Sequence, residues 1–398
     1  MLYQLSYIPR IDQRRIVRVL GFEPRTSALS ELRSSQLSYT RASQINSATP
    51  GGTPRPIRGS WNYKKDGMAV NCPAEFGRIP SSAGRIIRLV HTLDPRLRAI
   101  MSDAKPLRSP GARFREAYSK EILALPGVFC PLVARMAEGI GFRAVYLSGG
   151  ALSAGHGVPD IGLLTSNDFA AAAVAIASAT SLPLLCDADT GFGEALNVER
   201  TVRQFEQAGA AGLHLEDQQM PKRCGHLSGK SLVDAHDMAA KIRAAVAAKR
   251  DPDFVIVART DARGVTGYDD AVRRARIYLE AGADVIFPEA LEDSEEFANF
   301  ARDVPAPLMA NMTEFGKGPL LDTASLAALG YRIALFPLTA FRTAMKAAYQ
   351  TLAELHALGT QKPSLSRMMT RAELYDLLGY SGYETRDRSY FGGKSESP

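Results

Sequence analysis

The sequence predicts an α/β fold, a (β/α)8 TIM barrel with a C-terminal helical extension and a disordered N-terminal arm. From about residue 112, short apolar runs alternate with helical patterns. The runs are apolar throughout, which is typical of strands buried on both faces of a parallel sheet. Eight such units in about 240 residues fit a closed barrel. An open doubly wound sheet is the alternative, but no Gly-rich fingerprint follows the first strand.

Each apolar run is expected to form one strand, with a helix before the next. A glycine that follows a helical stretch is a common C-terminal stop, and we expect such stops at Gly139, Gly209 and Gly282. The predicted strands are 123–129, 144–147, 182–187, 212–216, 254–260, 284–288, 307–311 and 332–337. The predicted helices include 131–139, 167–180, 197–209, 235–248, 268–282 and 323–329.

Composition limits the class of protein. A chain of 398 residues with 45% hydrophobic content can bury a sizeable core, and no run of 18 or more apolar residues predicts a membrane span. The cysteines Cys72, Cys130, Cys186 and Cys224 show no zinc-finger or disulfide-framework spacing. We therefore expect reduced thiols and a cytoplasmic protein, or a mitochondrial one if the N-terminal arm is a transit peptide.

The positive charge is confined to the N-terminal arm. Residues 1–100 have a net charge of +10 and the remaining 298 residues a net charge of −4. The arm is rich in Arg, Ser and Pro and lacks periodicity, so we expect 1–104 to be a disordered extension. It could be a transit peptide, a nucleic-acid-binding tail, or a stretch upstream of the true start at Met101, which the break in composition favours. The barrel is expected over 105–360 and the C-terminal helical segment over 361–398.

Polar residues follow the apolar runs. These positions are the C-terminal ends of the predicted strands, where barrel enzymes build their active sites. A single such residue is usually a helix cap or a solvated side chain, but a set that recurs from strand to strand indicates a site. The set comprises Ser148-Gly149-Gly150, Asp187-Ala188-Asp189, Glu216-Asp217, Arg259-Thr260-Asp261, Glu289 and Asn311-Met312-Thr313-Glu314.

The carboxylates in this set predict a magnesium site. Asp187, Asp189 and Glu216 supply hard oxygen ligands, with Asp160 and Glu289 as candidates for an outer layer. Because side chains alternate along a strand, we expect only one aspartate of Asp187-Ala188-Asp189 to bind metal directly. Helix capping before Gly191 is the alternative role for these two aspartates.

The cationic and amide side chains predict an anionic substrate. Arg259 and Arg342 follow strand runs, and arginine forms bidentate pairs with carboxylates. A surface ion pair is the alternative for Arg342. Asn311, Thr313 and Ser148 can donate hydrogen bonds to further carboxylate oxygens. A di- or tricarboxylate is therefore favoured over a sugar phosphate, because no Gly-rich phosphate site is evident.

The stretch Lys222-Arg223-Cys224-Gly225-His226 places a thiol among cations. Neighbouring positive charge stabilises a thiolate, so Cys224 is expected to exchange protons near neutral pH, unless the stretch is an ordinary surface loop. His214 lies within a strand run and is expected to pack or form hydrogen bonds rather than to bind metal. Zinc is disfavoured because no His/Cys cluster is present.

These motifs resemble the isocitrate lyase/phosphoenolpyruvate mutase superfamily, and one branch of it most closely, the 2-methylisocitrate lyases. The resemblance covers about residues 108–392 in order, although Cys130-Pro131 departs from the residues common after the first strand. The motifs that carry it are Leu147-Ser148-Gly149-Gly150, Asp187 to Gly193, Glu216-Asp217-Gln218, Lys222 to His226, Arg259 to Ala262, Pro288-Glu289-Ala290, Asn311 to Gly316 and Thr370 to Tyr375.

The resemblance implies cleavage of 2-methylisocitrate to pyruvate and succinate in propionate catabolism. A base removes the hydroxyl proton, Mg²⁺ (or Mn²⁺) holds the alkoxide, and Cys224 protonates the succinate carbanion. Tyr146 is the candidate base, with a packed core tyrosine as the alternative. By the same resemblance, Asp187 and Asp189 serve the metal. The implied substrate-binding residues are Ser148, Gly149, Gly150, Gly225, His226, Arg259, Glu289, Asn311, Thr313, Arg342 and Arg371.

The resemblance also implies an assembly. Family members are homotetramers that exchange a C-terminal helix, and residues 364–380 are the expected exchanged segment. No nucleic-acid or membrane partner is expected, only a small tricarboxylate substrate. Another superfamily activity, on isocitrate, oxaloacetate or a related 2-oxo or 2-hydroxy acid, is the alternative function.

Overall fold

The computed structural model describes residues 64–65, 68–69, 108–223, 225 and 229–391. The chain divides into two compact units, Met1–Arg98 and Ala99–Pro398. In the first unit the described elements are β1 (Lys64–Lys65) and β2 (Met68–Ala69), which pair antiparallel. The expectation of a disordered arm over 1–104 therefore falls almost wholly outside the described residues.

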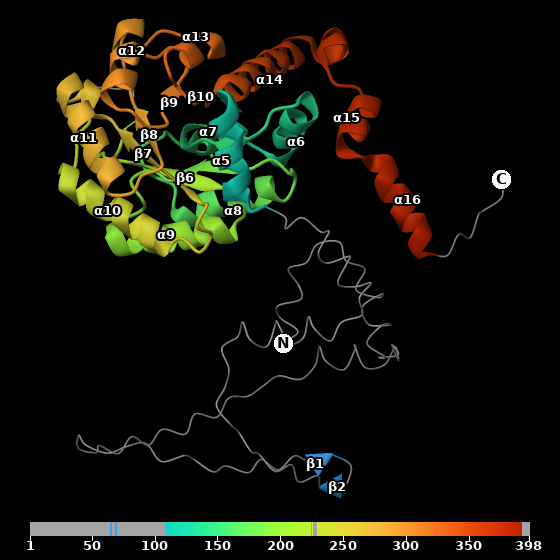
Figure 1. Ribbon diagram of the computed structural model, residues 1–398. Helices are drawn as coiled ribbons and strands as arrows, with labels where there is room; N and C mark the ends of the chain where they lie inside the picture. The colour runs from blue at the N-terminus through green and yellow to red at the C-terminus, as the bar shows by residue number, and fades with distance from the viewer. Residues whose placement is uncertain (1–63, 66–67, 70–107, 224, 226–228, 392–398) are drawn as a thin grey trace, which may run out of the picture. The chain divides into compact units, whose positions relative to one another are not determined.

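The second unit is built on parallel strands whose pairing forms a ring (Figure 1). β3 pairs with β10 and β10 with β9, while β4 to β8 pair in chain order. Parallel bridges from Gly127 to Tyr146 and from Ile286 to Leu308 join these two groups, so the pairing returns from the last strand to the first. An open sheet lacks such closure, and the predicted barrel requires it. The strands are β3 (Leu123–Pro126), β4 (Val145–Leu147), β5 (Leu184–Asp187), β6 (Gly212–Glu216), β7 (Val255–Thr260), β8 (Val285–Pro288), β9 (Met309–Asn311) and β10 (Ile333–Phe336).

Each of these strands lies within one of the predicted apolar runs. β6 has the predicted bounds, whereas β3 ends at Pro126 although its apolar run continues to Phe129. One further parallel bridge, from Gly127 to Tyr146, follows Pro126, and the chain then reaches Cys130, the extended N-cap residue of the next helix. Pro131 favours that extended conformation in the residue before it and stands at the first position of the helix.

The helices follow the strands in alternation. The predicted stops at Gly209 and Gly282 are confirmed, with φ of 87° and 102°. The predicted stop at Gly139 is wrong, because α6 continues to Ile140 and Gly141 takes the left-handed conformation with φ 105°. The helices are α5 (Pro110–Lys120), α6 (Pro131–Ile140), α7 (Gly149–Gly155), α8 (Ser166–Ala177), α9 (Ala195–Gln207), α10 (Ala235–Ala248), η2 (Ala262–Gly264), α11 (Tyr268–Glu280), α12 (Ser294–Asp303), α13 (Thr323–Ala328), α14 (Thr339–Leu358), η3 (Lys362–Arg367), α15 (Arg371–Leu378) and α16 (Tyr380–Tyr390).

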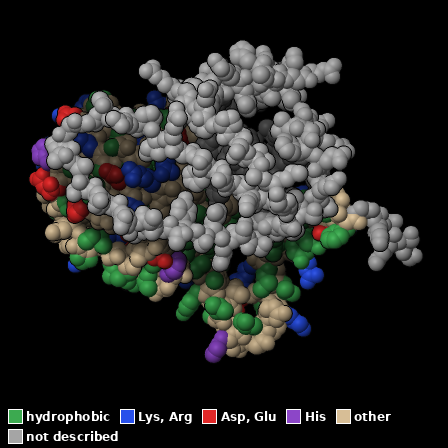
Figure 2. Space-filling model, turned by 90° about the horizontal axis from the view of Figure 1, so that it is seen from below, with side chains coloured by type: hydrophobic (Ala, Val, Ile, Leu, Met, Phe, Trp, Pro, Cys, Tyr) green, Lys and Arg blue, Asp and Glu red, His purple; other side chains and the backbone are tan. Residues whose placement is uncertain are grey.

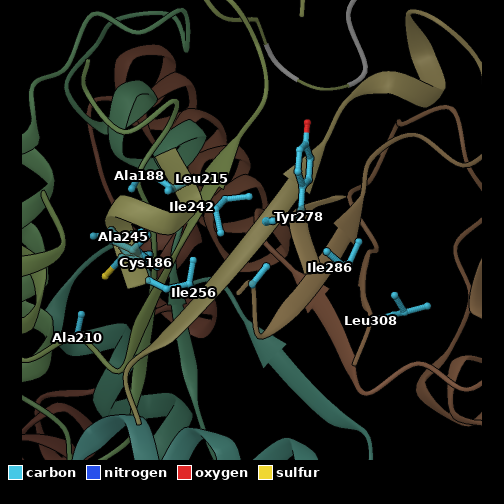
Figure 3. Packing of buried hydrophobic residues seen from close by; sticks show 14 of the residues in the cluster. Cys186, Ala188, Ala210, Leu215, Ile242, Ala245, Ile256, Tyr278, Ile286 and Leu308 are labelled. Carbon is cyan, nitrogen blue, oxygen red and sulfur yellow. The ribbon is translucent and has the colours of Figure 1, made fainter. Parts of the chain in front are cut away.

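Two apolar clusters divide the core between the two faces of the strands. The larger joins strand residues such as Cys186 and Ile256 to helix residues such as Ile242 and Tyr278 (Figure 3). The smaller joins alternate strand residues, among them Leu185, to Phe114 of α5. Because neighbouring side chains on a strand point to opposite faces, burial on both faces requires the continuous apolar runs seen in the sequence.

The last helices differ from those around the ring. No residue of α14, α15 or α16 is buried, although Tyr349, Leu352 and Tyr383 are large and apolar or aromatic. On the face seen in Figure 2, hydrophobic side chains lie at the surface among charged ones. None of the helices in the part of the chain that the structure describes has both the length and the apolar content to cross a membrane.

Candidate active site

A cavity lies at the C-terminal ends of the strands. It brings together side chains from different strands and from the segments that follow them, as expected of a barrel site. Asp160, Lys222 and Arg223 also line it. The predicted site residues that line it are Tyr146, Ser148, Gly150, Asp187, Gly225, Arg259, Glu289, Asn311 and Thr313.

Gly149 binds Asp187 through its backbone. Its N–H donates to Asp187 Oδ2 at 3.0 Å, and a Cβ at this position would lie 2.7 Å from the same oxygen. A larger residue would therefore push the carboxylate away. Ser148 caps the start of α7, where its side chain accepts a hydrogen bond from the Ala151 N–H, so the Ser-Gly-Gly sequence fixes both the helix and the aspartate.

Asp187, His214 and Tyr146 form a buried group. The Tyr146 hydroxyl lies 2.7 Å from His214 Nε2 and donates to Asp187 Oδ2 at 3.4 Å, while His214 Nε2 lies 3.3 Å from Asp187 Oδ1. Burial lowers the pKa of His214, which favours the neutral ring, as expected of a packed histidine. Burial and then the charge of Asp187 raise the pKa of Tyr146 well above its usual value. A tyrosinate at this position therefore requires additional positive charge nearby.

Lys222 bridges carboxylates from separate segments. Its ammonium lies 2.5 Å from Asp160 Oδ1 and 2.7 Å from Asp189 Oδ1, and the side chain is only 3% exposed. Despite burial, the surrounding carboxylates, Glu216 first, raise the pKa of Lys222. The strand ends at Asp187 and Asp189 adopts φ 45°, so strand alternation does not govern where the Asp189 side chain points.

The charges in this group are unequal. Burial and the charge of Asp187 raise the pKa of Asp189 to about 7, and burial raises the pKa of Glu216 well above its usual value. Despite burial, His214 and Lys222 lower the pKa of Asp187 to about 2. The group holds more carboxylates than the nearby cations can neutralise.

Arg259 binds three carboxylates at once. Its Nε and Nη2 donate to the Asp261 carboxylate at 2.9 and 3.0 Å, and it also lies 3.3 Å from Glu216 Oε2 and 3.5 Å from Glu289 Oε2. The guanidinium stacks over Phe287, 5.3 Å from the ring centre. Asn311 donates to Glu289 at 3.2 Å, which orients its amide at the cavity edge.

Two of the predicted functional residues cannot be placed. Cys224 and His226 lie outside the described residues. Gly225 is described and buried, and a Cβ on it would lie 2.5 Å from both Arg259 Nη2 and Glu289 Cγ. The peptide backbone therefore approaches the arginine as closely as glycine allows.

Arg342 and Arg371 do not reach the cavity of their own chain. Arg342 is 40% exposed on α14, lies 3.8 Å from Glu314 Oε2 and stacks over Phe315. Arg371 begins α15 and is exposed. The sequence placed both near family motifs, but neither side chain lines the cavity.

The apolar side of the cavity was missed in the sequence. Phe287, Leu335, Pro337 and Leu338 line it together with the charged residues, and we call these four residues the apolar wall. A signal was present, because Phe287 lies two residues before Glu289 and so shares its side of the strand. The residues of the apolar wall lie within or beside apolar runs, so the sequence pattern did not distinguish them from residues of the hydrophobic core.

The residues present fit a divalent cation. In the described part of the chain, no three His, Cys, Asp or Glu side chains form a ready-made metal site. Mg²⁺, however, is usually held by one or two carboxylates, with water or substrate oxygens as its other ligands. Asp187 and Asp189 offer hard oxygens in a group short of positive charge, and Glu216 Oε1 is buried with no hydrogen-bond partner among the described residues. An added cation would therefore relieve the excess of negative charge.

The parallel ring with a charged cavity at its C-terminal mouth defines an enzyme of the α/β-barrel class. The profile of the phosphoenolpyruvate phosphomutase family matches residues 114–356. This match spans more than half of the chain, so the protein belongs to that family.

Relatives and solved structures agree with this membership. The chain is 53% identical over 284 residues to the 2-methylisocitrate lyase of Aeropyrum pernix, covering 71% of this chain and 92% of that protein. It is 47% identical over 283 residues to the 2-methylisocitrate lyase of Escherichia coli, covering 70% and 96%. A crystal structure of phosphonopyruvate hydrolase in complex with oxalate and Mg²⁺ matches with a TM-score of 0.65 at 33% identity, covering 71% of this chain and 100% of that one.

Proposed function

We propose that the protein is a carbon–carbon lyase that cleaves 2-methylisocitrate to pyruvate and succinate. The observation that carries the proposal is the identity of about half of the aligned residues to proteins of that name, over nearly the whole length of those proteins. The cavity supports it, because its lining includes cationic and amide groups as well as the apolar wall. A tricarboxylate with one methyl substituent needs both kinds of surface.

The polar groups and the apolar wall of the cavity bind different parts of the substrate. Arg259 and Asn311 bind substrate carboxylates, with Thr313 and Ser148 as further donors. Glu289 orients Asn311 through the hydrogen bond at 3.2 Å. The apolar wall receives the methyl group. A methyl group cannot replace the hydrogen bonds to water that a polar surface would lose when the substrate covers it, whereas an apolar surface loses none.

Bond cleavage needs two proton transfers. Tyr146 accepts the proton of the substrate hydroxyl, and its hydrogen-bonded neighbour His214 holds the phenol oxygen in place. The electron pair of the broken carbon–carbon bond remains on the succinate carbon as the pyruvate carbonyl forms. Cys224 donates a proton to that carbon, since a thiol near neutral pKa can give up and regain one.

We also propose that magnesium binds beside these groups, at Asp187 and Asp189. A bound divalent cation would hold the alkoxide and an adjacent carboxylate oxygen by charge, and would favour ionisation of a neighbouring hydroxyl. Tyr146 needs that positive charge, because burial and Asp187 oppose its ionisation.

The exposed C-terminal helices support a homotetramer. Large side chains such as Leu355, Leu358 and Tyr383 lie on the surface of helices that bury no residue of their own. Burial of such side chains against a neighbouring copy is favourable, at about 25 cal/mol per Å² of apolar surface. Exchange of residues 364–380 would bring Arg371 close to another subunit. Arg371 could then bind substrate there, which it does not do in its own chain.

Another activity of the same family is the rival function. A crystal structure of oxaloacetate acetylhydrolase matches with a TM-score of 0.68 at 35% identity. The test is steady-state cleavage of 2-methylisocitrate, isocitrate and oxaloacetate with Mg²⁺. We expect 2-methylisocitrate to have the highest kcat/KM by at least about tenfold, because one well-placed methyl group contributes about 1–3 kcal/mol to discrimination. Equal turnover of isocitrate, or turnover of oxaloacetate alone, would reject the proposal.

A further inference from the structure

Lys230 joins the loop beside the cavity to a strand end. Its ammonium donates to the Gly225 carbonyl at 2.5 Å and to Asp261 Oδ1 at 2.7 Å, and its side chain is only 2% exposed. A buried ammonium is costly unless it is paired and hydrogen-bonded, and both conditions are met here. A lysine placed in this way fixes the carbonyl that it binds.

Asp261 is itself held in place. Arg259 forms a bidentate pair with the Asp261 carboxylate, and the backbone N–H of Asp261 donates to Asp217 Oδ1 at 2.9 Å. Asp217 is fully buried and also accepts hydrogen bonds from Thr260 and Tyr278, at 2.8 and 2.7 Å. Lys230 therefore binds to a rigid point at the end of β7.

The peptide at Gly225 touches the substrate-binding residues. A Cβ on Gly225 would come within 2.5 Å of both Arg259 and Glu289, so the position has no room for another side chain. Upstream, Gln218 binds the Arg223 backbone twice, accepting from its N–H and donating to its carbonyl, each at 2.8 Å. The loop is thus attached at Arg223 by Gln218 and at Gly225 by Lys230.

We propose that Lys230 is a positioning residue that sets where the Gly225 peptide lies against Arg259 and Glu289. Gln218 by itself does not hold the Gly225 peptide, because its hydrogen bonds are to Arg223, two positions earlier in the chain. Lys230 holds that peptide by linking the Gly225 carbonyl to Asp261, the same carboxylate that orients Arg259. The inference rests on the proposed function and adds a residue that acts through the loop.

The test compares Lys230→Met with Lys249→Met. Lys249 is a matched control, because it is also mostly buried and donates to a backbone carbonyl, that of Phe254, at 3.1 Å. It lies 3.7 Å from Asp284, at the opposite end of β7. Both variants should show similar losses of Tm. Only Lys230→Met should lower kcat for 2-methylisocitrate, by at least about tenfold, because small misplacements near reacting groups are costly. KM should change less than about threefold, since Asp261 still orients Arg259.

Limited trypsin digestion gives a readout that does not depend on the substrate. Loss of the Lys230 contact should speed cleavage after Arg223 at least about fivefold in Lys230→Met and leave it unchanged in Lys249→Met. If the wild type proves inactive on 2-methylisocitrate, the proposed function fails while the digestion still decides the role of Lys230. Unchanged kcat and digestion, or the same changes in Lys249→Met, would overturn the inference.

A second variant covers the case in which Lys230→Met does not fold. Gly225→Ala leaves the Lys230–Asp261 pair intact but forces a Cβ against Arg259 and Glu289. It should reproduce the lower kcat and the faster cleavage after Arg223. Wild-type values for both measurements would contradict the importance of this peptide's position.

Discussion

The two ends of the strand ring carry buried and half-buried charges for different purposes. At the N-terminal end, Arg115 lies 2.8 Å from Asp284 and donates to the Asp253 carbonyl, beside the apolar Phe114 of the same helix. These groups are partly exposed and paired. At the C-terminal end, Asp187, Asp189 and Glu216 are deeply buried, and the carboxylates there exceed the cations near them. The paired charges at the N-terminal end stabilise the barrel. The excess negative charge at the C-terminal end favours binding of a cation and catalysis.

The largest effect should come from the thiol proposed to act at the C-terminal end. Cys224→Ser replaces a thiol with an alcohol, which is a much weaker acid. We expect kcat to fall by about 10²–10⁴ with little change in Tm, the range associated with loss of a general acid. Steady-state kinetics and a thermal melt measure both. A rate close to wild type would remove Cys224 from the mechanism and weaken the contrast between the two ends.

The excess of carboxylates at this end predicts how stability depends on pH. The pKa of Asp189 is raised from its usual 3.8 to about 7, so the metal-free fold favours its protonated form. The contribution of this group to stability is therefore fully present below about pH 4 and is lost as pH rises through 7. Because Mg²⁺ competes with the proton, the gain in Tm on adding Mg²⁺ should be larger at pH 8 than at pH 5.5, by several degrees.

Asp189→Asn sharpens this test. The amide does not titrate, so the metal-free variant should lose the Asp189 part of the decline in Tm between pH 5.5 and pH 8 and gain less from Mg²⁺. Melting curves at the two pH values, with Mg²⁺ and with a chelator, supply the comparison. An unchanged response to Mg²⁺ in Asp189→Asn would exclude this carboxylate from the metal site.

The smallest effect on activity should come from the opposite end. Arg115→Met removes the pair with Asp284 but keeps the apolar stem that packs α5 against the ring. We expect Tm to fall by about 2–4 °C, as for a loss of about 1 kcal/mol in a domain of this size, with kcat/KM within twofold of wild type. A large loss of activity without a loss of Tm would show that the two ends are not separate in function.

The sequence determined much of the fold and the membership of the site. Continuous apolar runs marked each strand of the ring, because a strand buried on both faces leaves no position for polar residues until it ends. The polar residues that follow, from Ser148 to Asn311, therefore pointed to one mouth before any contact was known. Helix bounds were predicted to within a few residues, and the error at Gly139 arose because a nearby glycine, Gly141, offered the same stop.

The tertiary structure alone decided how these residues act on one another. The bridge from Lys222 to Asp160 and Asp189, the contact of Gly225 with Arg259, and the apolar wall all join residues that lie far apart in the chain or look like ordinary core. Arg342 and Arg371 carried equally good motifs, yet their helices place them outside the cavity. Periodicity is local and can be seen in a sequence. Desolvation and charge pairing depend on which distant segments meet, and only the folded chain brings them together.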